Sequence, residues 1–162
     1  MNRNTGNRIK HTYQLNTDDD PTEEELQSFF AALKRIASLG HLTPEEHEFV
    51  DSLIEYFGIE RQLAEKAFEL ALDSSTSDSQ LMEAVHTEGL KHALLREAYR
   101  MAMLDGTVDK WESGFLGMLE THSKLCNDQV RETLDQVSEE FQLLGVFART
   151  VRRIQNWDGS SS

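Results

Sequence analysis

Apolar residues recur along this chain at the three- and four-residue spacing of amphipathic helices, and we find no convincing alternation of the kind that marks a half-buried strand. The pattern therefore predicts an all-α fold of about seven helices. They are expected from the cap at Asp20 or Thr22 to Gly40, from Thr43 to Gly58, from about Glu60 to Leu72, from about Gln80 to Val85, from about Thr87 through Ala102, from Asp109 through Leu119, and from Asn127 through Val151.

The predicted helix ends rest on recognisable capping residues. Thr43 can cap, Pro44 suits the first helical position, and Glu46 completes a capping box three residues after the threonine. Gly58 then stops that helix. The segment 73–79, DSSTSDS, is rich in capping side chains and is predicted to be a loop.

The last predicted helix carries a seam of apolar residues at alternating steps of four and three. Such a seam suits packing against other helices, either within the core of this chain or across a homodimer. Its members are Val130, Leu134, Val137, Phe141, Leu144, Ala148 and Val151.

Two parts of the chain resemble each other. SLGHLTPEEHEFVDSL, residues 38–53, aligns with LDGTVDKWESGFLGML, residues 104–119, so that Gly40 meets Gly106 and Glu46 meets Glu112. The apolar positions that follow also coincide. The economical architecture is two related helical hairpins packed about a pseudo-twofold axis into one compact bundle.

Composition sets the domain limits. Residues 1–19 are polar and lack the apolar core of a secretory signal, so they are predicted to be a flexible arm. Residues 20–157 are expected to form a single domain, and residues 158–162 a disordered tail. No apolar run approaches the length of a membrane span, which predicts a cytoplasmic protein without direct membrane insertion.

Charge and missing motifs exclude several function classes. The formal net charge of −13 disfavours nucleic acid and anionic lipid as partners, because both require a basic face. A single cysteine, Cys126, excludes an internal disulfide, a four-thiolate zinc site and a CxxC redox pair. No glycine-rich dinucleotide loop, phosphate-binding loop or GxSxG motif is present, so we expect no enzymatic activity.

An acidic loop, DGTVDKWE at residues 105–112, is the main candidate for binding chemistry. It matches the last eight positions of a calcium-binding EF-hand loop, but Met101 and Met103 stand at the first and third ligand positions and cannot bind a hard cation. Two interpretations stay open. Asp105 can accept hydrogen bonds in the turn while Glu112 caps its helix. Alternatively, a Ca²⁺ or Mg²⁺ site can form from Asp105, Asp109 and Glu112, with Glu46 from the other repeat.

Other potential metal ligands fit structural roles better. His47 with Asp51, and Glu88 with His92, have the spacing of helical zinc pairs, yet such pairs are more often surface hydrogen bonds. Met101, Met103 and Met118 are expected to fill the core.

Two copies of a turn of the type ADGxhxxxE between amphipathic helices resemble the tellurite-resistance TerB family and its relatives, among them the N-terminal domain of membrane-anchored DnaJ co-chaperones. The resemblance covers about residues 24–140. HALLREAYRMAMLDGTVDKWE, residues 92–112, matches best, whereas the first copy has Leu39 for the family's aspartate.

The resemblance implies an all-helical, pseudo-symmetric fold and a bacterial stress-response role. It also implies metal ions or membrane-associated proteins as partners. Two functions are therefore expected as alternatives: a non-enzymatic protein-interaction module, or a hard-cation binder that uses the loop from Asp105 to Glu112.

Overall fold

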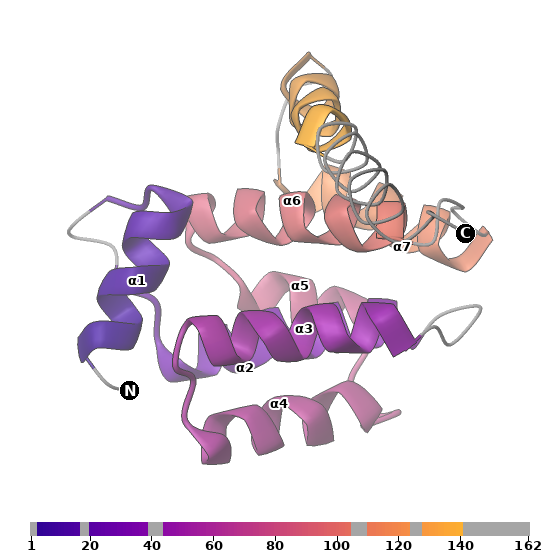
Figure 1. Cartoon of the computed structure of the whole chain (residues 1–162). Coiled ribbons are helices and arrows are strands. Elements are labelled where there is room, and N and C mark those ends of the chain that lie inside the picture. Colours follow the sequence, from indigo (N-terminus) through magenta and orange to yellow (C-terminus); the bar gives the residue numbers. More distant parts are fainter. Residues whose placement is uncertain (1–2, 17–19, 39–43, 105–109, 124–127, 141–162) are drawn as a thin grey trace, which may run out of the picture. The chain divides into compact units, whose positions relative to one another are not determined.

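The computed structural model describes residues 3–16, 20–38, 44–104, 110–123 and 128–140; within these ranges the side chains of 44–45 and 110–113 are not described. The regular secondary structure of the described residues consists of helices without a strand, which confirms the all-α class (Figure 1). The helices are α1 (Arg3–Tyr13), α2 (Glu23–Ala37), α3 (Pro44–Tyr56), α4 (Arg61–Leu72), α5 (Asp78–Ala84), α6 (Glu88–Leu104) and α7 (Lys110–Ser123). A further helix covers residues 128–140.

The chain divides into two compact units, residues 1–125 and residues 126–162. In the second unit, the described helix buries Thr133 and Val137, while Leu134 is exposed. Of the three seam members in the described part, Val137 is therefore buried, Val130 is half-buried and Leu134 is exposed. Its members from Phe141 onward lie outside the described residues.

Helix α2 lies at the centre of the first unit, in contact with α3, α4, α5 and α6. Most of its residues are buried, because an apolar surface that nearly surrounds a helix must be covered on all sides. The buried members are Glu25, Leu26, Ser28, Phe29, Phe30, Ala31, Ala32, Leu33, Ile36 and Ala37. Thr22 caps the helix, as predicted, by accepting a hydrogen bond from the Glu25 amide at 3.1 Å.

Helix α3 begins at Pro44 and ends before Gly58, both as predicted. Gly58 adopts a left-handed φ of 64°, the conformation that a Schellman ending requires. The amide of Ile59 donates to the Ile54 carbonyl, and the amide of Gly58 donates to the Glu55 carbonyl, both at 3.0 Å. These bonds satisfy carbonyls that the helix end would otherwise leave without partners.

The N-terminal segment contains a helix that the sequence pattern does not predict. Residues 3–13 form α1, and its Thr5 and Ile9 are buried. Thr5 donates to the Gly58 carbonyl at 3.0 Å and Arg8 to the Tyr56 carbonyl at 2.7 Å, so α1 also caps α3. The segment has too few apolar residues for a helical period to be recognised, and tertiary contacts hold it instead. The predicted boundaries at residues 19 and 157 fall on undescribed residues and stay predictions.

Helices α6 and α7 pack against each other, as do α2 and α3, so both hairpins of the predicted repeat are present as neighbouring helix pairs. The pseudo-twofold relation between the pairs stays a prediction. The buried face expected for α6 is confirmed at Leu90, Leu94, Leu95, Ala98, Met101 and Ala102. No described helix combines the length and the apolar character needed to cross a bilayer.

Candidate functional site: a groove between helices α5 and α7

Helix α5 is short, and its position depends on capping at its start. The Ser77 hydroxyl accepts from the Gln80 amide at 3.1 Å, and the Gln80 side chain accepts from the Ser77 amide at 2.8 Å. This reciprocal capping box satisfies two amides at the helix start. The sequence pattern predicts this helix only from about Gln80 to Val85, because the whole segment 73–79 has the composition of a loop and hides the capping box.

Arg35 of α2 holds the connection between α4 and α5 through hydrogen bonds. Its guanidinium donates five hydrogen bonds of 2.7–3.2 Å, to the carbonyls of Leu70, Ala71, Asp73 and Thr76 and to the Asp78 carboxylate. Every nitrogen of the rigid guanidinium is used. One largely buried side chain thus holds the end of α4, the loop and the start of α5 in a fixed relation to α2.

Helix α7 turns two different faces to its surroundings. Phe115, Leu116 and Leu119 are buried, as predicted. Tyr99 of α6 also holds α7, because its hydroxyl donates to the Glu120 carboxylate at 2.6 Å. The exposed face of α7 carries Gly114, Gly117, Met118 and Thr121, which share one side of a helix at their spacing of three and four residues.

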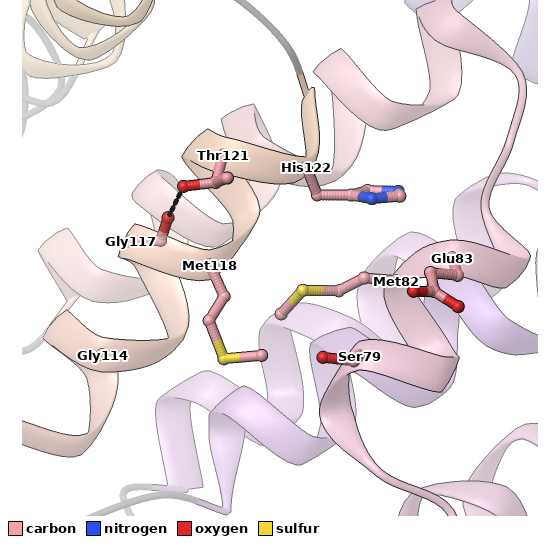
Figure 2. A pocket seen from close by; sticks show the side chains of 8 residues that line it. All are labelled: Ser79, Met82, Glu83, Gly114, Gly117, Met118, Thr121 and His122. Carbon is pink, nitrogen blue, oxygen red and sulfur yellow. Dashed lines mark hydrogen bonds between the residues drawn. The ribbon is translucent and has the colours of Figure 1, made fainter.

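That exposed face forms one wall of a groove of about 500 Å³, and α5 forms the other (Figure 2). The lining residues are Ser79, Met82, Glu83, Gly114, Gly117, Met118, Thr121 and His122. In Figure 2 the side chains of Met82 and Met118 extend toward each other from the two helices. A volume of this size is typical of small-molecule and peptide sites.

His122 spans the end of the groove. Its Nε2 lies 3.1 Å from the Val85 carbonyl. A carbonyl oxygen can only accept, so Nε2 carries the proton in this hydrogen bond. The contact joins the last turn of α7 to the residue that follows α5, and it fixes the width of the groove at that end.

The groove is open at the positions where side chains would normally fill it. A Cβ added at Gly114 or at Gly117 would meet no heavy atom within 4 Å. Met118 is 38% exposed, whereas Met82 opposite it is buried. The assignment of Met118 to the core was therefore wrong, although Met101 is in the core as expected. Met118 lies four residues after Gly114, on the helix face that carries the two glycines and not on the face of Phe115 and Leu119. This spacing is the signal that could have placed Met118 on the exposed face of α7.

The structure does not bring the predicted cation ligands together within the described residues. Asp105 and Asp109 lie outside them, and Glu112 falls in the first turn of α7 where side chains are not described. Glu46 is buried in α3, with 0% exposure. The part of the chain that the structure describes contains no cluster of three or more His, Cys, Asp and Glu able to hold a metal. The Ca²⁺ or Mg²⁺ site stays a prediction.

The pair His47 and Asp51 has a lysine between its members. Lys34 Nζ lies 2.9 Å from the Asp51 carboxylate and 3.4 Å from His47 Nδ1. Burial, and then the charge of Lys34, lower the pKa of His47, with Asp51 acting in the opposite direction. An ammonium group already occupies the place where a zinc ion would bind this pair.

Comparisons of the chain with protein-family models, curated proteins and solved structures found no match. The candidate site therefore rests on its own geometry.

Proposed function

We propose that this chain is a non-enzymatic protein-interaction module that binds an amphipathic helix of a partner protein in the groove between α5 and α7. The observation that carries the proposal is an open groove of about 500 Å³ with a methionine on each wall. Methionine side chains are flexible and polarizable, and they are frequent on surfaces that accept apolar side chains of partners.

The two glycines of α7 support a helix as the occupant. Glycine in the middle of a helix is unfavourable by about 1 kcal/mol relative to alanine. Gly114 and Gly117 lie on the exposed face of α7 in spite of this cost to helix stability. No neighbouring atom of the described chain requires a small residue at either position. A missing side chain lets the backbone of another helix approach closely.

Charge selects a basic partner. Glu83 lies on the α5 wall and is exposed, and the chain as a whole carries −13. A partner helix with an apolar stripe flanked by Lys or Arg would pair its stripe with the methionines and its cations with the acidic wall. The resemblance to the TerB family supports a cytoplasmic stress-response context for this interaction, and it is part of the proposal.

The test is a binding titration on the full chain with a designed probe. The probe is a fluorescein-labelled amphipathic peptide with leucines at positions i, i+3, i+4 and i+7 and lysines on the opposite face. A peptide with alanines in place of the leucines is its control. We expect saturable binding of the leucine peptide, and binding at least about tenfold weaker to Met118→Lys, since a buried charge opposes apolar contact.

Leu72→Lys is the matched variant, because Leu72 is 83% exposed on α4 and does not line the groove. It should bind the probe as the unmodified chain does. Equal binding to Met118→Lys and Leu72→Lys, or no binding at all, would overturn the proposal.

A further inference from the structure

A second, smaller cavity lies between the end of α1 and the first half of α6, which contact each other (Figure 1). Its volume is about 230 Å³, and its walls are Tyr13, Gln14, Gly89, His92, Ala93 and Arg96. The four α6 residues have the spacing of a single helix face. Two of them, Gly89 and Ala93, have little or no side chain. Leu15 packs against Gly89 so closely that an added Cβ would clash with it, and the cavity lies beside this contact.

Two hydrogen-bond donors at this cavity lack an acceptor in the described part of the chain. Tyr13 Oη and Arg96 Nε are both buried from solvent, and neither has a hydrogen-bond partner among the residues that the structure describes. A buried donor without an acceptor is unfavourable, and more so when it belongs to a charged group. Two such donors on the wall of one cavity are therefore expected to share an acceptor from outside the chain.

The chemistry of the two groups defines the ligand class. Burial raises the pKa of Tyr13 well above its usual value, and the charge of Glu97 adds to the rise, against the opposing effect of Arg100 and Arg96. The tyrosine hydroxyl therefore keeps its proton at neutral pH and acts as a donor. The guanidinium of Arg96 is always charged and can only donate.

Neighbouring charges are already compensated in other ways. Arg100 donates to the Glu97 carboxylate. The N-terminus of α6 is capped by the buried carboxylate of Glu25, which accepts from the amides of His86 at 3.1 Å and Thr87 at 2.7 Å. Arg96 is thus the cation at this cavity that a ligand would neutralise.

We propose that the cavity between α1 and α6 binds a small oxyanion, of the size of phosphate or sulfate, whose oxygens accept from Tyr13 Oη and Arg96 Nε. The volume exceeds that of one such ion, so ordered waters or a small organic substituent would share the site, at about 30 Å³ for each water. Water alone is the competing occupant. It can accept hydrogen bonds but cannot neutralise Arg96.

The test compares thermal unfolding of the full chain in sodium phosphate, sodium sulfate and sodium chloride at matched ionic strength, together with ³¹P line broadening of phosphate. Phosphate is expected to raise Tm above the chloride value and to show a broadened, saturable ³¹P signal. Because sulfate stabilises many proteins non-specifically, the variants decide the assignment.

Tyr13→Phe removes the hydroxyl and keeps the ring, which packs against Phe29 and Phe57 with centroids 5.9 and 5.5 Å away. It should weaken phosphate binding about tenfold without lowering Tm in chloride, because it removes a donor that finds no acceptor among the described residues. Arg96→Gln should abolish the phosphate effect. Arg61→Gln, on the exposed surface of α4, should leave it unchanged.

Two results would overturn the proposal. One is a phosphate response that is absent, or is equal in the unmodified chain and in both cavity variants, which would leave water as the occupant. The other is a loss of stability of Tyr13→Phe in chloride, which would mean that the hydroxyl has a partner within the protein. Neither result bears on peptide binding in the groove between α5 and α7.

Discussion

Arg35 and Arg96 are two largely buried arginines of the same unit with opposite surroundings. Arg35 meets five acceptors that α4, α5 and their connection supply, and its hydrogen bonds are complete. Arg96 lines a cavity and leaves its buried Nε without an acceptor among the described residues. The first arginine is explained by the fold that it stabilises. The second has no such explanation among the described residues, and the oxyanion that we propose for its cavity would supply the acceptor.

The largest expected effect on stability comes from replacing an arginine by methionine. Methionine keeps most of the length of the side chain and removes its hydrogen-bond donors. Arg35→Met should lower the free energy of unfolding by about 3 kcal/mol, because four carbonyls, most of them in part-buried hydrogen bonds, and the Asp78 carboxylate lose their donor. Arg96→Met should lower it by less than about 1 kcal/mol. Urea unfolding in chloride measures both. Equal losses of unfolding free energy in the two variants would contradict the proposed difference between the two arginines.

The Glu25→Gln variant tests whether the Glu25 carboxylate serves as the anion at the start of α6. Glu25→Gln should lower the free energy of unfolding by about 1–2 kcal/mol, since the amides of His86 and Thr87 lose a charged acceptor at a helix start. Glu24→Gln, at an exposed position of the same turn, is the control and should change stability by less than about 0.5 kcal/mol. If phosphate restored the stability of Glu25→Gln alone, the anion would bind at the helix end rather than at Arg96.

A substitution at Gln14 tests how much the left-handed conformation at the end of α1 costs in stability. Its φ of 54° is left-handed, and the amides of Leu15 and Gln14 donate to the carbonyls of Lys10 and His11 in a Schellman ending. Gln14→Gly should therefore raise the free energy of unfolding by about 0.5–1 kcal/mol.

The matched change is Gly58→Ala at the end of α3, which should lower the same quantity by about 1 kcal/mol. A Cβ there would be 3.5 Å from Thr5 Oγ1, an ordinary contact, so the loss comes from the backbone conformation. A Gln14→Gly variant that unfolded more readily than the unmodified chain would contradict this account.

The smallest expected effect is that of Asp73→Asn, which should change how stability depends on acid pH. Asp73 lies in the connection between α4 and α5 that Arg35 holds. Hydrogen bonds from the Ser75 hydroxyl and amide, and from the Thr76 hydroxyl, lower the pKa of Asp73. A carboxyl whose folded pKa is lowered stabilises the fold above its unfolded pKa of about 3.9, and this contribution is lost as the pH falls through the folded pKa. Asp73→Asn should therefore show a flatter stability profile below about pH 4. A profile that stays parallel to that of the unmodified chain would argue against the turn.

Local sequence signals determined most of the helices of this protein. Thr22, Pro44 and Gly58 mark helix ends because capping depends on residues within one turn of each other. The buried face of α6 follows from the spacing of its leucines, alanines and Met101, since a helix repeats its contacts every 3.6 residues. The predicted cation loop depended on local spacing too, and its acidic side chains lie outside the described ones.

Tertiary structure alone decided which groups meet across the chain. Helix α1 has little apolar pattern of its own and is held by Phe29, Phe57 and the end of α3. Arg35 finds its acceptors more than thirty positions away. The open groove beside Met118 exists because packed helices leave a gap at that place, and Arg96 Nε lies at another such gap without an acceptor among the described residues. A residue's spacing shows which helix face it occupies, but only the packing of the other helices determines whether that face is covered, satisfied or left open to a ligand.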